Sequence, residues 1–257
     1  MTETPDPMLQ LLGRADGPFA GASLWQLEVV DGRMLTPRMR RIDFTGPNLG
    51  DLAYLPGQDL MLRIPVEDGT INRRYTIRSH DPVRAVLTID AVVHGDGQGS
   101  RWLTAAAAGD RLDAIGPRGK VHLAEGVAWH LFAGDESALP AMLAMAEAAP
   151  AGAEAIVLAE VADEGDELTA AGHSIDVRWL HRGGVEPGRS PILTEALADV
   201  TLPDGPGHAY LAGEARAVAA MRGALLARGV PAESISAKAY WSHGRSNASH
   251  GEPERMG

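Results

Sequence analysis

The spacing of apolar residues changes once along this 257-residue chain, near residue 123. Before that point, short runs of alternating apolar and polar residues are separated by Pro, Gly and Asp turns, a pattern typical of a small antiparallel barrel. After it, strand-like apolar runs alternate with helix-like segments, which favours a parallel sheet covered by helices. We therefore expect two domains, at residues 20–123 and 124–257.

The same patterns predict individual elements. In the first domain we expect strands at 25–30, 40–44, 60–64, 74–78 and 85–93, and one helix at 100–108, capped by Ser100 and ended by Gly109. In the second we expect strands at 129–133, 155–160, 175–180 and 208–212, and helices at 138–149, 193–198 and 215–228, the last ended by Gly229. The expected fold class is an N-terminal antiparallel Greek-key β-barrel followed by an α/β nucleotide-binding domain with a parallel sheet.

Composition excludes several classes of function. The chain has no cysteine, which rules out disulfides, thiolate-bound zinc, cysteine-bound iron–sulfur clusters and cysteine nucleophiles. None of the nine histidines forms a HisxxxHis pair on a helix-like run, so we predict no metal site. A net charge of −11 argues against nucleic-acid binding. Any redox chemistry would therefore need a bound organic cofactor.

Charge and hydropathy also bear on location. Residues 1–126 hold 14 Lys/Arg against 16 Asp/Glu, whereas residues 127–257 hold 9 against 18, so the two halves differ in electrostatic character. The longest apolar run, Ala138 to Ala149, is too short to span a bilayer, and the first residues lack the plan of a signal peptide. We expect a cytoplasmic protein without stable membrane insertion.

The segment Arg73-Arg74-Tyr75-Thr76 carries the clearest chemical signal. It places a guanidinium, an aromatic ring and a hydroxyl on one expected strand, and these groups suit the phosphate, the ring and the N5 edge of a flavin nucleotide. Taken alone, the segment is equally compatible with an ordinary strand. The glycine-rich turn at 94–100 opens the expected helix, where backbone N–H groups could hold a pyrophosphate.

Several motifs together resemble the siderophore-interacting protein family, within the ferredoxin–NADP reductase superfamily. They are Arg74-Tyr75-Thr76-Ile77-Arg78, the stretch 87–99, Gly116-Pro117-Arg118-Gly119, the segment 134–141, Ala212-Gly213-Glu214 and the segment 239–244. The likeness covers about residues 25–245, and no single motif carries it. The resemblance implies an FAD-dependent ferric-siderophore reductase that passes electrons from NADPH or NADH, or from a ferredoxin, to siderophore-bound Fe(III).

The resemblance also implies a set of binding residues. Arg73 would neutralise the FAD phosphates, Tyr75 would pack against the isoalloxazine ring and Thr76 would reach its N5 side. The other predicted cofactor contacts are Arg78, Asp90, Val92, His94, Gly97, Gly99, Ser100, Trp102, Gly134, Asp135, Glu136, Ser137, Gly213, Glu214, Tyr240 and Trp241. No catalytic side chain is predicted, because the cofactor would carry the electrons.

The donor and the substrate are less sharply defined. Acidic residues after the second strand of the α/β domain, Glu160, Asp163 and Glu164, suit a ribose hydroxyl better than a 2′-phosphate, although Arg182 leaves NADPH open. Basic residues before the flavin strand and after Tyr240-Trp241 could attract an anionic ferric chelate; the predicted substrate contacts are Arg38, Arg40 and Arg245. Two alternatives remain: a general flavin-dependent NAD(P)H dehydrogenase with a quinone or flavin acceptor, and a non-enzymatic siderophore-binding protein.

Overall fold

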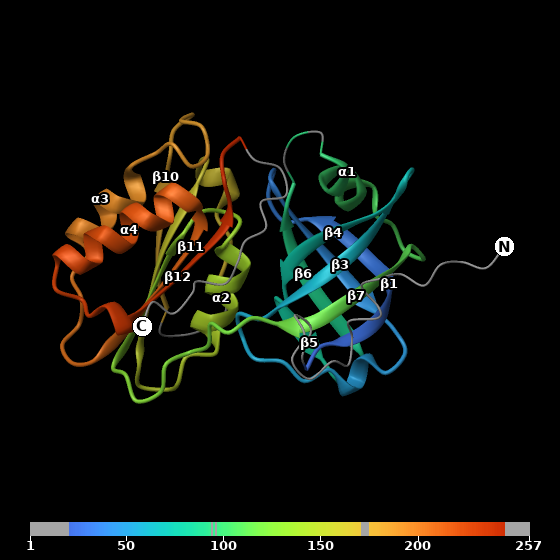
Figure 1. Ribbon diagram of the computed structural model, residues 1–257, viewed down its shortest axis with the longest axis horizontal. Coiled ribbons are helices and arrows are strands. Elements are labelled where there is room, and N and C mark those ends of the chain that lie inside the picture. Colours follow the sequence, from blue (N-terminus) through green and yellow to red (C-terminus); the bar gives the residue numbers. More distant parts are fainter. Residues whose placement is uncertain (1–20, 94, 96, 171–174, 245–257) are drawn as a thin grey trace. The chain divides into compact units, whose positions relative to one another are not determined.

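The computed structural model describes residues 21–93, 95, 97–170 and 175–244 (Figure 1). His94 and Arg245, both predicted as contacts, lie outside the described residues. The chain divides into two compact units. One holds the described residues through Met34 together with Arg40–His122, and the other holds Leu35–Met39 and the described residues from Leu123 onward.

The first unit is a curled antiparallel sheet. Over the described residues its strands lie in the order β4-β3-β7-β1-β2-β6-β5. The pairs β1–β2, β1–β7, β3–β4, β3–β7 and β5–β6 are antiparallel. Their bounds are β1 Ser23–Met34, β2 Met39–Thr45, β3 Asp59–Val66, β4 Gly69–Thr76, β5 Ser79–Asp81, β6 Val86–Val92 and β7 Arg111–Arg118. A short 3-10 turn, η2, covers Leu49–Asp51, and α1 covers Gln98–Ala105.

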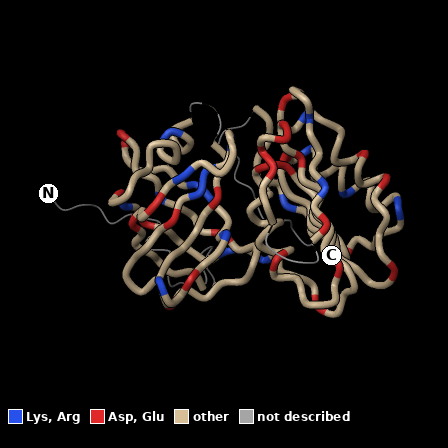
Figure 2. Tube along the Cα trace, turned by 180° about the vertical axis from the view of Figure 1, so that it is seen from behind, with Lys and Arg blue, Asp and Glu red and all other residues tan. Residues whose placement is uncertain are grey.

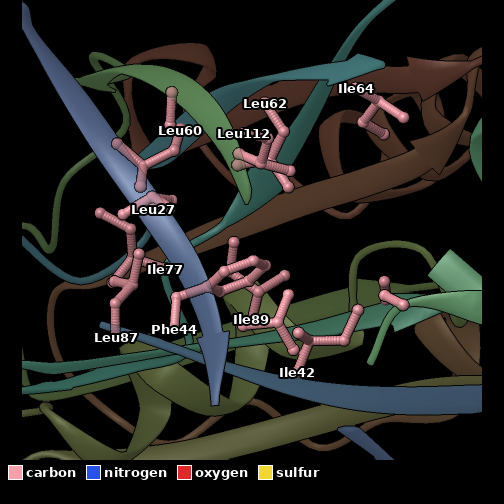
Figure 3. Close-up of a cluster of buried hydrophobic side chains, with 14 of the residues drawn as sticks. Leu27, Ile42, Phe44, Leu60, Leu62, Ile64, Ile77, Leu87, Ile89 and Leu112 are labelled. Carbon is pink, nitrogen blue, oxygen red and sulfur yellow. The ribbon is translucent and has the colours of Figure 1, made fainter. Parts of the chain in front are cut away.

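Alternation along the strands builds the core of this sheet. Leu60, Leu62 and Ile64 alternate along β3 and are fully buried. Figure 3 shows them with side chains from β1, β2, β6 and β7 that point into the same apolar interior. Each such side chain contributes roughly 1.5–3 kcal/mol when it leaves water. The period-two pattern of the sequence therefore fixed which face of each strand became buried.

Two local predictions for this unit were wrong. The helix is capped by Gly97 rather than Ser100, and it ends at Ala105, well before Gly109. Gly109 N–H instead donates to the carbonyl of Val29. The segment 111–118 forms β7, between β3 and β1; its apolar residues Leu112, Ala114 and Ile115 are buried, but its Gly-Pro pair indicated only a turn.

The second unit has the expected α/β architecture. Over the described residues its strands lie in the order β10-β9-β8-β11-β12 and are parallel. The strands are β8 Trp129–Gly134, β9 Glu154–Val161, β10 Ile175–His181, β11 Gly207–Glu214 and β12 Ile235–Trp241. The helices are α2 Leu139–Glu147, α3 Ile192–Asp199 and α4 Ala215–Ala227, with 3-10 turns η3 Glu164–Asp166 and η4 Ala232–Ser234. The predicted fold class is confirmed.

The parallel sheet is covered on both faces (Figure 1). Alternate residues such as Leu131 and Leu211 pack with α3 and α4 through Leu197 and Met221. The intervening residues face the other side, where α2 packs on β8 and β9. Helices on both faces explain why these strands read as nearly continuous apolar runs. Among the described residues, no helix is long and apolar enough to cross a membrane.

A layer of aromatic and histidine rings lies on β8 and β11. The rings of Phe132 and Tyr210 are stacked with centroids 4.9 Å apart, and His208 and Tyr210 are 4.7 Å apart. His130 is fully buried, with its Nδ1 3.3 Å from the Tyr210 hydroxyl. Burial lowers the pKa of His130, so the folded state holds this ring neutral.

We expect His130 to make folding sensitive to acid. Because its pKa is lowered on folding, the unfolded chain binds more protons at His130 below about pH 6.5, and the contribution of this ring to stability falls as the pH drops from 7 to 5. His130→Phe, which keeps a ring beside Phe132, should lose less unfolding free energy than the wild type over this pH range. Urea unfolding followed by circular dichroism at several pH values would measure it. The exposed His122→Gln is the control; equal acid sensitivity in wild type and His130→Phe would contradict the prediction.

Candidate functional site

The edge strand β4 presents Arg73 and Tyr75 on one face. In the antiparallel register, Arg73 is opposite Leu62 and Tyr75 is opposite Leu60, so their side chains share the face of those core leucines. Tyr75 packs against the core cluster. Thr76 projects to the other face, opposite Asp59, and is 7% exposed. One face of β4 therefore carries the Arg73 guanidinium and the Tyr75 ring, and the Thr76 hydroxyl lies on the opposite face.

The neighbouring arginines of β4 have different environments. Arg74 is held by a fork to Asp59, with Nε 2.8 Å from Oδ1 and Nη2 2.5 Å from Oδ2. Arg73 donates from Nη1 to the carbonyl of Asn72 at 2.8 Å. A single backbone carbonyl leaves most of the five N–H donors of the Arg73 guanidinium for an anion. Arg73, rather than Arg74, therefore has donors left for a phosphate, and its contact with one stays a prediction.

Arg73 lies against the start of α1. A Cβ added to Gly99 would meet the Arg73 side chain at 3.3 Å from Cγ and 3.4 Å from Nε. Gly97 caps the helix without a side-chain hydrogen bond, and a Cβ there would meet nothing within 4 Å. The Arg73 side chain therefore packs against the first turn of α1 at Gly99, and the space beside Gly97 is open. These residues fit the pyrophosphate of FAD.

Tyr75 is suited to pack against a flat ring. Burial raises the pKa of Tyr75 to about 12, with Arg73 acting in the opposite direction. The phenol is therefore neutral at physiological pH and offers an apolar face. Trp102 of α1 is partly buried against the same core, and Val92 ends β6 beside the turn that leads to α1. The structure thus brings Arg73, Tyr75 and the α1 N-terminus together; their contacts with FAD stay predictions.

Asp90 is an anchor for two arginines. It is 2% exposed on β6 and accepts a fork from Arg41, with both N···O distances 2.7 Å. Arg78 Nε lies 3.6 Å from Asp90 Oδ2. The buried carboxylate of Asp90 faces these two guanidinium groups, and its predicted contact with the cofactor stays a prediction.

The predicted substrate arginines have partners within the protein. Arg38 pairs with Asp166 and lies 3.6 Å from Asp163. Arg40 donates to the carbonyls of Thr104 and Ala106, the latter at 2.7 Å. These contacts orient both side chains, and their role in binding a chelate stays a prediction.

In the second unit, the site candidates lie at the carboxyl ends of the parallel strands. The strand order reverses between β8 and β11, the position where ligands bind in open α/β sheets. Gly134 ends β8, and a Cβ there would lie 2.2 Å from the carbonyl oxygen of Ala212. Glycine at 134 is therefore required for β8 and β11 to approach this closely.

Asp135 joins three strands at this point. Its carboxylate accepts from the Ser137 amide at 2.9 Å and hydroxyl at 2.5 Å, the Glu214 amide at 2.9 Å and the Trp241 indole Nε1 at 2.8 Å. A Cβ at Gly213 would lie 2.5 Å from the same carboxylate. These four donors show that Asp135 orients Trp241 and the β11 end, and its predicted contact with the cofactor stays a prediction.

The carboxylate of Glu214, like that of Asp135, accepts hydrogen bonds from nearby backbone amides. One oxygen accepts from the amides of Arg216 at 2.6 Å and Ala217 at 3.0 Å and so caps α4, while the other accepts from the His243 amide at 3.2 Å. A Cβ at Gly188 would lie 2.5 Å from Glu214 Cγ and 3.1 Å from the Trp241 ring. The loop after β10 therefore reaches the ends of β11 and β12. Tyr240 has the Lys238 ammonium 5.5 Å from its ring centre.

Three buried charged residues form a second cluster at this edge. Arg182 Nη1 is 2.6 Å from Glu136 Oε1 and 3.9 Å from Glu160 Oε1, and all three residues are below 8% exposed. Burial raises the pKa of Glu136, with Arg182 opposing the shift. Burial and nearby Asp135 raise the pKa of Glu160 to about 7. Among the described residues, no group of three or more His, Cys, Asp or Glu side chains could hold a metal ion.

Sequence reasoning did not identify Arg182 and Glu160 as partners. Glu160 lies in β9 and Arg182 directly follows the neighbouring strand β10, 22 positions away in the chain, and an arginine after a strand has no distinctive local pattern. The only available signal was that both residues directly follow or end an apolar strand, where polar residues gather at one edge.

Comparisons with known proteins agree with this architecture. Residues 57–121 match the siderophore-interacting FAD-binding domain and residues 127–244 match the siderophore-interacting protein model. The ferric vibriobactin reductase ViuB of Vibrio cholerae is 30% identical over 90% of this chain and 93% of its own. A siderophore utilization protein from T. fusca has a TM-score of 0.81 and 35% identity, over 89% of this chain and 96% of its own. The NADPH-dependent ferric-chelate reductase of Escherichia coli is 26% identical over 63% of each chain.

The fold and the family matches define a flavin-dependent oxidoreductase with the fold of the ferredoxin–NADP reductase superfamily. The matches extend over nearly the whole of the described chain. The chain belongs to the siderophore-interacting protein family. The resemblance stated from the sequence is confirmed.

Proposed function

We propose that this protein is an FAD-dependent reductase of ferric siderophores that takes its electrons from a reduced nicotinamide dinucleotide. The observation that carries the proposal is the convergence of Arg73, Gly99 and the α1 N-terminus beside the neutral Tyr75 ring. Relatives named as ferric reductases support the choice of acceptor. The first unit would be the FAD-binding domain, and the second the nucleotide-binding domain.

The protein residues would bind and orient rather than exchange protons. Arg73 and the first-turn amides of α1 would neutralise the pyrophosphate, and Tyr75 would provide a flat apolar surface. The chemistry that FAD would supply in this site is two-electron uptake of a nicotinamide hydride and one-electron delivery to two Fe(III) chelates in turn, with release of the proton. Hard oxygen ligands hold Fe(II) less tightly than Fe(III), so reduction would release the iron. Arg38, Arg40 and Arg245 are the proposed chelate contacts.

The test combines cofactor content with half-reactions. We expect purified protein to be yellow with an oxidised-flavin spectrum. Under anaerobic conditions a reduced nicotinamide nucleotide should bleach it, and a ferric siderophore should restore the colour while a ferrous chelator traps Fe(II). Reduced ferredoxin is the third donor to compare. A colourless protein that refuses added FAD would refute the proposal, and reoxidation by quinones but not by ferric chelates would favour the general dehydrogenase.

Location in the cytoplasm remains part of the proposal. Release of Fe(II) there would deliver the metal directly to intracellular ligands. Immunodetection of the protein in fractionated cells, with a cytoplasmic marker enzyme as reference, would check it. Recovery of the protein with periplasmic or membrane fractions would contradict it.

A further inference from the structure

We infer that Glu160, with Arg182 held by Glu136, selects a dinucleotide donor whose adenosine ribose carries no 2′-phosphate, so that NADH is preferred over NADPH. The inference rests on the proposed function, because it concerns the donor of that reaction. It is carried by the position of Glu160, by the partners of Arg182 and by the charge of the surrounding edge.

Glu160 occupies the position at which the adenosine ribose of a dinucleotide would bind. It lies near the end of β9, the second strand of the unit in chain order and the neighbour of β8. In doubly wound sheets an acidic residue after the second strand accepts a hydrogen bond from the ribose 2′-hydroxyl. Glu160 is 2% exposed, and its Oε1 has no hydrogen-bond partner among the described residues. A buried acceptor without a donor is suited to a ligand hydroxyl.

Arg182 is the residue that could instead favour a 2′-phosphate. It follows β10 directly, with its amide bonded to the carbonyl of Val161. Its guanidinium lies 2.6 Å from Glu136, and both side chains are below 10% exposed. Glu136 lies in the connection from β8 to α2, so this ion pair joins the segments that follow β8 and β10. The cation is thus already neutralised, and a phosphate placed beside it would also face Glu160 at 3.9 Å from the guanidinium.

The rest of this edge adds negative charge. Asp163, Glu164 and Asp166 follow β9 in and around η3, and Figure 2 shows acidic positions gathered at one end of this unit. Arg38, the nearest cation to η3, pairs with Asp166 and Asp163. The exposed Arg216 follows β11, on the other side of β8 from β9. A phosphate dianion at β9 would therefore be repelled, whereas a ribose hydroxyl would be bound.

The first experiment measures binding rather than turnover. Calorimetric titration of the FAD-loaded full chain with NAD⁺ and NADP⁺ should show at least tenfold tighter binding of NAD⁺. Glu160→Gln removes the charged acceptor, and Glu136→Gln releases Arg182; each should reduce the preference at least fivefold. Glu154→Gln, an exposed acid at the start of the same strand, is the matched control and should leave the preference within twofold. Rates of flavin bleaching by NADH and NADPH should follow the same order.

The pH dependence gives a readout that a merely structural role would not change. The charged groups facing Glu160 are Asp135, Glu136 and Arg182. As Glu160 ionises around pH 7, its carboxylate becomes a stronger acceptor for the hydroxyl and repels phosphate more strongly. The NAD⁺/NADP⁺ preference should therefore rise between pH 6 and 8 in the wild type. In Glu160→Gln it should stay flat over that range.

Several outcomes would overturn the inference. They are equal or tighter binding of NADP⁺ by the wild type, an unchanged preference in both Glu136→Gln and Glu160→Gln, and binding of neither nucleotide. The proposed function is tested separately, because chemically reduced protein should still reduce a ferric siderophore whichever donor it accepts. If the reduced protein fails to reduce a ferric siderophore but still selects NAD⁺, the proposed function is refuted and the inference about the nucleotide site is not.

Discussion

Replacement of Arg73 by alanine is expected to weaken FAD binding by about 10- to 150-fold. The estimate follows from the roughly 1.5–3 kcal/mol that a hydrogen bond to a charged group contributes. Arg73 lies over Gly99 at the start of α1 and is the arginine of β4 that a backbone carbonyl, rather than a carboxylate, holds. Titration of the cofactor-free protein with FAD, followed by flavin fluorescence, would measure the dissociation constant. Arg73→Lys should recover part of the loss, because it restores the charge but not the fork.

The neighbouring Arg74 provides a matched control. Its guanidinium forms a fork with the buried Asp59, so Arg74→Ala should lower the free energy of unfolding while FAD affinity stays within a fewfold of wild type. Arg73→Ala should show the reverse pattern, with weak FAD binding and nearly unchanged stability of the cofactor-free protein. Equal FAD affinity in wild type and Arg73→Ala would remove Arg73 from the phosphate site.

Replacement of Glu160 by glutamine is expected to stabilise the protein at alkaline pH. Burial raises the pKa of Glu160 from 4.5 to about 7. At this carboxyl the folded state therefore binds more protons than the unfolded chain between these values, and the contribution of Glu160 to stability falls as the pH rises through this window. The shift is about 2.5 pKa units, so at about 1.4 kcal/mol per unit the loss above pH 7 is on the order of 3 to 4 kcal/mol. Glutamine carries no charge and avoids this loss.

Urea unfolding at pH 5.5 and pH 8.5 would measure the effect. The difference in unfolding free energy between Glu160→Gln and wild type should grow with pH, whereas it should stay constant for the exposed Glu154→Gln at the start of the same strand. Arg182 keeps Glu136 as a partner at 2.6 Å in the Glu160 variant, so its charge is not left alone. A pH-independent difference would show that Glu160 is ionised in the folded state throughout this range.

Sequence reasoning succeeded where the chemistry is local. The alternating residues of β3 predicted its buried face, and the change of pattern near residue 123 predicted the two kinds of sheet. It failed for β7, because Gly116-Pro117 suggests a turn while the pairing of β7 with β1 and β3 comes from residues far away in the chain. It also chose Ser100 as a cap, where Gly97 takes that position.

The residues of the candidate site were predictable from the sequence, but their partners were not. The sequence placed Arg73 and Tyr75 on a strand, and the family resemblance assigned them to FAD. It could not tell how Arg73 and Arg74 differ, since that depends on Asp59 across the sheet. Nor could it show that Asp135 is occupied by donors from Ser137, Glu214 and Trp241. These partners are fixed by strand order, which sequence spacing does not contain.

The sequence by itself determined the two architectures, the absence of cysteine chemistry and the strand that carries the flavin signal, because each depends on residue type and short-range periodicity. Only the tertiary structure decided which charges are neutralised inside the protein. Arg182 is the clearest example: in the sequence it left NADPH open, and in the fold it lies between Glu136 and Glu160. A buried charge takes its properties from neighbours in space, and the parallel sheet brings those neighbours from three separate strand ends.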